Sequence, residues 1–130
     1  MLARLARDRG SAPAEFVMVG ALLTVLALSV VQLGLALHVR NTVLDSASEG
    51  ARFAALADNR LDDGVARTRE LITVAIGAGY ARDVTASYGS YLGHPAAIVT
   101  VRAPLPVFGL IGFDRGLEVT GHAAVETLGQ

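Results

Sequence analysis

The hydrophobic and polar positions divide the chain into one unbroken apolar segment and a patterned remainder. A run of 22 residues, 16–37, carries no formal charge, and only Thr24, Ser29 and Gln32 interrupt it. At about 1.5 Å per residue, a helix of that length spans roughly 33 Å, which matches the hydrocarbon core of a bilayer. The buried helix of a soluble protein is the alternative, but such helices are usually shorter and carry a polar stripe. The run therefore predicts a transmembrane helix over residues 11–37.

The spacing of apolar residues after this run predicts that the helix continues into an outer domain. Small apolar residues follow at helical intervals, namely Val39, Val43, Ala47, Ala51 and Ala54. Asp58-Asn59 is expected to end the helix, and a second helix is expected to begin near Asp62, its N-cap. The apolar face of that second helix consists of Leu61, Val65, Thr68, Ile72 and Ala75. Gly77-Ala78-Gly79 is expected to terminate it.

The rest of the chain alternates between apolar and polar residues with a period of two, which is typical of strands packed on one face. The apolar positions form three sets: Val84, Ala86 and Tyr88; Ala97, Val99, Val101 and Ala103; and Leu117, Val119, Gly121, Ala123 and Val125. Residues from Gly89 to Pro95 suit a hairpin loop between the first two strands. We therefore predict an α+β fold with a long N-terminal helix, a second short helix and a small antiparallel sheet of about three strands, whose apolar face the two helices cover.

Charge on the N-terminal side of the apolar run predicts the orientation of the chain. The leader contains three basic residues against one acidic residue: Arg4, Arg7, Arg9 and Asp8. Basic residues close to a first span are retained on the cytoplasmic side of the membrane. We therefore expect a cytoplasmic leader over residues 1–10, the transmembrane helix over residues 11–37, and an extracytoplasmic α+β domain over residues 38–130.

Composition narrows the classes of function. The net charge is -1 and no long basic block is present, so the chain has no electrostatic footprint for nucleic acid. Cysteine is absent, which excludes a disulfide framework and a thiolate metal site. The histidines, His38, His94 and His122, are far apart in sequence, and none has a second ligand at helical or strand spacing. We therefore expect no catalytic residue, no cofactor, no metal and no small-molecule substrate.

Two segments at the ends of the apolar run resemble a known family. The first is Gly10, four further residues and Glu15-Phe16, which is similar to the class III signal of type IV prepilins. The second is SASEGARFAA over residues 46–55, and the two together resemble the TadE-like family of pilus assembly proteins. This resemblance implies a minor pilin or pseudopilin of the tight-adherence (Tad/Flp) system, with a sheet packed on the outer half of a long helix. It also implies that a prepilin peptidase cuts between Gly10 and Ser11.

Glu15 lies at the edge of the apolar run, where a carboxylate is costly. Burial in a membrane costs about 2.5–3.5 kcal/mol on insertion scales and less near the interface, so a lone carboxylate there indicates a function. Cleavage after Gly10 would create an α-amino group at Ser11, and in an assembling bundle that amine would neutralise the Glu15 of a neighbour. The resemblance implies the same assembly role, with Phe16 as part of the recognised segment. The alternative places Glu15 in the headgroup layer, where the helix dipole favours negative charge.

Two further regions are candidate contact surfaces. Gly20, Ala27 and Gly34 recur every seven residues and predict a narrow face for close helix packing, although small residues are common in any span. The second region is the unusually apolar connection 104–113, where two prolines exclude a central strand. Its large side chains either fold under the sheet or stay exposed as a membrane or partner contact: Leu105, Phe108, Ile111 and Phe113.

Two classes of function follow. The first is a structural subunit: a single-pass minor pilin in the cell membrane, matured after Gly10, whose partners are the membrane, prepilin peptidase, other pilus or pseudopilin subunits and the inner assembly platform. The second is an uncleaved single-pass anchor that carries an extracytoplasmic binding module. A cleaved secretory signal is a further alternative because Gly34-Leu35-Ala36 offers small residues to a signal peptidase, although the apolar region is longer than usual.

Overall fold

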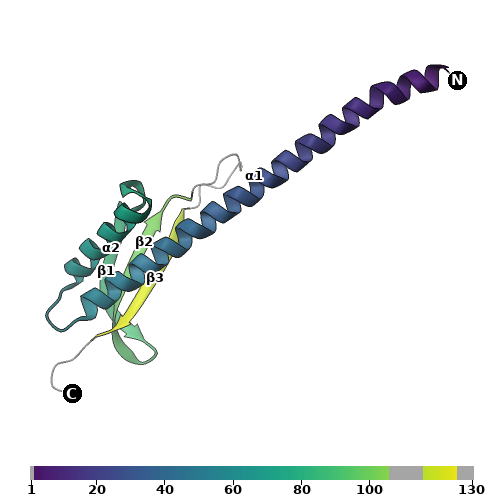
Figure 1. Cartoon of the computed structure of the whole chain (residues 1–130). Coiled ribbons are helices and arrows are strands. Elements are labelled where there is room, and N and C mark those ends of the chain that lie inside the picture. The colour runs from purple at the N-terminus through teal and green to yellow at the C-terminus, as the bar shows by residue number, and fades with distance from the viewer. Residues whose placement is uncertain (1, 106–115, 126–130) are drawn as a thin grey trace. The chain divides into compact units, whose positions relative to one another are not determined.

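A computed structural model describes the backbone of residues 2–105 and 116–125 and the side chains of residues 10–105 and 116–125 (Figure 1). Its elements are α1 (Leu2–Ala55), α2 (Leu61–Ile76), the 3-10 helix η1 (Ala78–Tyr80), β1 (Asp83–Tyr91), β2 (His94–Ala103) and β3 (Leu117–Ala124). The strands form one antiparallel sheet in the order β1-β2-β3. The predicted α+β fold is therefore confirmed. The chain divides into two compact units, Met1–Gly34 and Leu35–Gln130, with the division inside α1.

The first unit consists of the N-terminal part of α1. Every described side chain from Gly10 to Val19 is exposed. The hydroxyl groups of Thr24 and Ser29 donate hydrogen bonds to backbone carbonyl groups one turn earlier, at 2.8 Å and 2.7 Å. Such bonds satisfy the polar atoms within the helix itself, which a helix in lipid requires.

The second half of α1 belongs to the second unit, Leu35–Gln130, which contains the domain predicted to lie outside the membrane and is called the outer unit below. The predicted apolar face is confirmed, because Val39, Val43, Ala47, Ala51 and Ala54 are all buried. The predicted end at Asp58-Asn59 is wrong, because α1 ends at Ala55. Asn59 nevertheless acts at this end: its backbone N–H donates to the carbonyl of Leu56 at 3.0 Å, and its side-chain amide donates to the carbonyl of Phe53 at 2.8 Å. The Phe53 carbonyl, which also accepts from the backbone N–H of Leu56 at 3.3 Å, thus gains a second donor at the end of the helix.

The start of α2 differs from the prediction by two residues. The N-cap is Arg60, not Asp62. The acidic side chain that caps this helix is that of Asp63, which lies in the first turn and reaches back to the N-cap residue. The Asp63 carboxylate accepts a hydrogen bond from the backbone N–H of Arg60 at 2.7 Å. The prediction also placed Ala75 on the packed face, but Ala75 is exposed. The buried residues are Gly64, Thr68 and Ile72.

The connection between β1 and β2 is shorter than predicted. The loop expected from Gly89 to Pro95 is wrong: the ladder runs to the pair Tyr91↔His94 and leaves only Leu92 and Gly93 as the turn. Both turn residues have positive φ, 51° and 80°. Positive φ at both positions is typical of two-residue hairpin turns, whose twist matches that of the flanking strands.

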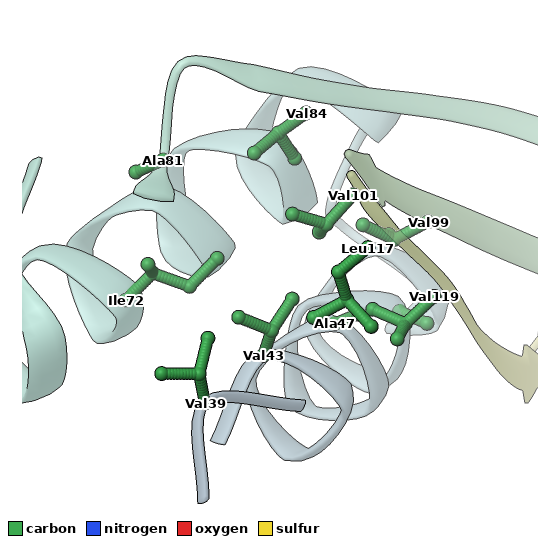
Figure 2. Packing of buried hydrophobic residues seen from close by; sticks show 11 residues of the cluster. Val39, Val43, Ala47, Ile72, Ala81, Val84, Val99, Val101, Leu117 and Val119 are labelled. Carbon is green, nitrogen blue, oxygen red and sulfur yellow. The ribbon is translucent and has the colours of Figure 1, made fainter. Parts of the chain in front are cut away.

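The core lies between one face of the sheet and the two helices (Figure 2). Its members come from α1, α2, all three strands and, in the case of Ala81, the connection between η1 and β1: Val39, Val43, Ala47, Ala51, Ile72, Ala81, Val84, Val99, Val101, Leu117 and Val119. The predicted inward face of β2 is thus confirmed, and that of β3 is confirmed from Leu117 to Gly121; Ala123 is half-buried, and Val125 lies beyond the end of β3. In β1, Val84 is buried and Ala86 is half-buried, but Tyr88 is exposed, so the far end of β1 extends past the core.

Glycines allow the backbones around this core to approach closely. A Cβ atom added to Gly121 in β3 would lie 2.5 Å from the carbonyl carbon of Ala47 in α1. One added to Gly64 in α2 would lie 2.7 Å from the carbonyl oxygen of Gly50 in α1. Real Cβ atoms do not tolerate such separations, so these glycines determine how near α1 lies to α2 and to the sheet.

Candidate functional site

The predicted processing and assembly residues all lie on α1. Gly10, Ser11, Glu15 and Phe16 are exposed, and the side chain of Phe16 is 79% exposed. Ser11 and Glu15 are one helical turn apart, so they occupy the same side of the helix. The chain alone therefore presents the entire recognition segment at its surface.

The apolar run that follows has no packing partner within the described chain. Its large side chains are exposed, including Leu22, Leu26, Val30 and Leu33. Among the described residues, one helix is long and apolar enough to cross a membrane: it contains an 18-residue window of mean hydropathy 2.4, of which none is buried. Exposed apolar surface on this scale marks a contact with lipid or with other proteins.

The small residues of the run lie on this exposed helix. Gly20 is half-buried, whereas Ala27 and Gly34 are exposed. A Cβ atom added to Gly20 or Gly34 would meet nothing within 4 Å. The face is thus unpacked in the single chain, and its use in helix packing stays a prediction.

The apolar connection 104–113 is placed only in part. Leu105 is half-buried and packs against the core cluster. Phe108, Ile111 and Phe113 lie outside the described residues. Leu105 thus favours folding of this connection under the sheet, and the structure tests neither alternative at the other three residues.

The histidines do not form a metal centre. His38, His94 and His122 are exposed, and no three His, Cys, Asp or Glu side chains come together for a metal ion in the part of the chain that the structure describes. The described surface carries open hollows of ≈ 340, 330 and 310 Å³.

One aromatic contact was not predicted. The rings of Tyr91 in β1 and His122 in β3 stack, with centroids 4.4 Å apart and planes inclined by 15°. Tyr91 pairs with His94 and His122 pairs with Ile98, so both side chains are diagonal neighbours of Ala96 on the face away from the helices. Ala96 is 1% exposed. The strand register places Tyr91 and His122 close together. The sequence pattern did not predict this contact because it assigned residues 89–95 to a loop.

Comparisons with known proteins find one family. The family model described as TadE-like protein matches residues 10–52. No curated protein and no solved structure matches the chain. The matched segment begins at Gly10, includes the whole apolar run and stops at Arg52, three residues before α1 ends. The resemblance to the TadE-like family is therefore confirmed, over residues 10–52.

Proposed function

We propose that this chain is a membrane-anchored minor pilin or pseudopilin that acts in the assembly of a Tad/Flp-type pilus or secretion apparatus. The observation that carries the proposal is the extent of the TadE-like match, which begins at Gly10 and covers the exposed apolar helix. In this proposal the helix crosses the membrane once. The basic leader over residues 1–10 stays in the cytoplasm, and residues 38–130 form the extracytoplasmic domain.

Maturation by a prepilin peptidase between Gly10 and Ser11 is the first step of this function. Pro13 lies inside α1, where a proline removes a backbone hydrogen bond and crowds the preceding turn. In a chain that begins at Ser11, Pro13 would belong to the first turn, whose N–H groups have no intrahelical partner in any helix. Cleavage thus removes the residues with which Pro13 conflicts, and leaves it in a position that suits proline.

Assembly through Glu15 is the second step. At about 4 Å and with an effective dielectric constant of about 20, a carboxylate and an amine attract by about 4 kcal/mol. This attraction is comparable to the insertion cost of about 2.5–3.5 kcal/mol for the lone carboxylate. The new amine at Ser11 is one turn from the Glu15 of its own chain and is equally available to a neighbour. Helices that share these pairs gain a fixed axial register, with Phe16 and the face formed by Gly20, Ala27 and Gly34 as their contact surface.

The mass of the membrane-extracted protein tests maturation. In cells with an active prepilin peptidase we expect a chain that starts at Ser11, and in cells without it a chain that starts at Met1. A chain that starts at Met1 in both strains would overturn the pilin proposal in favour of an uncleaved binding module. A start near Leu37 would indicate a secretory signal. Replacement of Gly10 by valine is a matched control, because it should block cutting and leave the helix intact.

The variant Glu15→Ala tests assembly separately from cutting. We expect processing at Gly10 to continue, because the scissile bond and Gly10 are unchanged. Co-isolation with other pilus subunits and the inner assembly platform should fall by about tenfold or more, as expected for the loss of a charge pair in a low-dielectric site. Glu15→Gln is the control for shape, and it should show the same defect. Unchanged co-isolation would remove Glu15 from this role.

A further inference from the structure

The β1–β2 hairpin gathers exposed apolar side chains at its turn. Tyr88, Tyr91 and Leu92 are 59%, 48% and 81% exposed, and together they are called the hairpin tip below. Single apolar residues at a surface are ordinary, but three within five residues form a patch. The whole hairpin, residues 83–103, belongs to the described part of the chain. The hairpin tip is therefore a candidate contact surface of the outer unit.

Leu92 occupies a backbone position that leucine does not favour. Its φ is 51°, and the first position of such a two-residue turn is usually asparagine, aspartate or glycine. A leucine in this conformation brings its Cβ close to the following carbonyl oxygen, and it has no polar atom that could form a local hydrogen bond. The side chain also contributes nothing to the core, because it is 81% exposed. Strain that the fold itself does not use indicates a contact with another molecule.

Tyr91 is held in place before any contact forms. Its ring stacks on that of His122 across the sheet, with centroids 4.4 Å apart. A side chain that is already ordered loses less conformational entropy when it binds. Tyr91 thus supplies a preorganised apolar surface directly beside Leu92.

The hairpin tip lies at one end of the outer unit. Ala97 packs with Ala54 and Ala55 in the last turn of α1, and Tyr88 is the register partner of Ala97. The strand continues from Tyr88 to Tyr91, which adds about 10 Å at the usual rise per residue. The turn therefore projects past the contact between the sheet and the end of α1, where a second molecule can reach it.

The hairpin carries no formal charge along most of its length. From Val84 to Val101 there is no Asp, Glu, Lys or Arg, whereas charged residues are frequent from Asp58 to Asp83. Two copies of a chain that meet about a two-fold axis present the same surface to each other, so a charged surface would repel itself. A surface without Lys or Arg also lacks attraction for nucleic acid and for anionic lipid. The uncharged, apolar hairpin tip is thus complementary to itself.

We propose that the hairpin tip is a contact between two copies of this chain, in which Leu92 and Tyr91 of one copy pack against the same residues of the other. The contact is reversible, because three side chains per copy bury less than the roughly 1,200 Å² of a stable interface. It is independent of cleavage at Gly10 and of the assembly role of Glu15.

The absence of cysteine from the chain allows a test with one introduced thiol. Ser90→Cys places it beside the turn and leaves the hairpin tip intact. The purified full chain in detergent micelles is treated with a short bismaleimide crosslinker. Ala75→Cys is the control, because Ala75 is also exposed but lies in the last turn of α2. We expect covalent dimers to form about tenfold faster in Ser90→Cys, the ratio expected for burial of a leucine side chain. Association through the apolar run would raise both rates and cancel in their ratio.

The substitution Leu92→Asn separates the contact from folding. Asparagine suits a φ of 51° better than leucine does, so the urea unfolding midpoint of the outer unit should stay the same or rise. Added to Ser90→Cys, Leu92→Asn should lower the rate of dimer formation about tenfold. A leucine that served only the fold of the hairpin would show the opposite result, a lower midpoint and unchanged crosslinking. Equal rates in Ser90→Cys and Ala75→Cys, or an undiminished rate with Leu92→Asn, would overturn the proposal.

Discussion

The two halves of α1 belong to one helix but obey opposite rules. From Phe16 to Leu37, large apolar side chains are exposed on all sides. From Val39 to Ala55, one face carries valine and alanine side chains that are buried against α2 and the sheet, and only Leu44 and Phe53 are large apolar residues with exposed side chains. The most apolar half of α1 is thus the exposed half, and the less apolar half is the one that is buried. The apolar side chains of the first half lie at the surface of the chain, as those of a lipid or protein contact do. Those of the second half pack against α2 and the sheet of the same chain.

The largest expected effect comes from replacing a glycine by valine, at Gly121 in the outer unit and at Gly20 in the apolar run. Gly121→Val would place side-chain atoms where the backbone of Ala47 and Ser48 lies, at 2.5–2.6 Å. Backbone atoms of a helix cannot move aside singly, so we expect a loss of about 3 kcal/mol or more, and the outer unit should fail to fold. Urea unfolding of the full chain in detergent, monitored by the outer unit's tyrosines, measures this.

Gly20→Val is the matched control, because a Cβ at Gly20 would meet nothing within 4 Å. It should leave the unfolding midpoint of the outer unit unchanged. If the two variants destabilised the outer unit equally, the close approach of β3 and α1 would not be what stabilises it.

The sequence pattern predicted this contrast because the first half is uncharged throughout and the second half has a clear helical period. An uncharged run has no face, and small apolar residues at helical spacing have one, so the span and the packed face follow from the sequence alone. The inward face of β2 followed equally well, but Tyr88 in β1 was predicted inward and is exposed. What the pattern missed depends on contacts between distant residues.

The Gly89–Pro95 loop shows why. Glycine and proline are turn signals in a sequence, but Gly89 lies within β1, where an added Cβ would be 2.6 Å from the Cδ1 of Ile98. Pro95 is the second residue of β2, near a strand end where one missing N–H is tolerated. Their roles depend on pairing between strands, which no local signal contains. Cleavage at Gly10 and pairing at Glu15 are likewise undetermined by one chain, because both need a second molecule.

A charge in each region gives the second test. Leu26→Asp places a carboxylate near the middle of the exposed apolar run, where insertion into a membrane costs about 2.5–3.5 kcal/mol. The fraction of the protein that resists alkaline extraction from membranes should fall, while the outer unit keeps its unfolding midpoint. Leu56→Asp is the control, because Leu56 is also exposed but lies in the outer unit. Equal extraction of both variants would contradict a membrane-spanning role for the run.

The smallest and most closely matched test compares two threonines with the same local hydrogen bond. The Thr24 hydroxyl donates to the carbonyl of Gly20, and the Thr68 hydroxyl to the carbonyl of Gly64, both at 2.8 Å. Only Thr68 is buried, and its hydroxyl also lies 3.5 Å from the carbonyl oxygen of Ser46 in α1. Thr68→Val should therefore destabilise the outer unit by about 1 kcal/mol, which differential urea unfolding resolves.

Thr24→Val removes the same bond from an exposed site and makes the span more apolar. It should leave the outer unit unaffected and membrane extraction unchanged or lower. Because the two substitutions are chemically identical, any difference between them measures the packing around Thr68, where a hydroxyl lies against Gly50 and a methyl group must fit in its place. A Thr24→Val variant as destabilised as Thr68→Val would mean that the helical bond itself, not burial between α1 and α2, carries the effect.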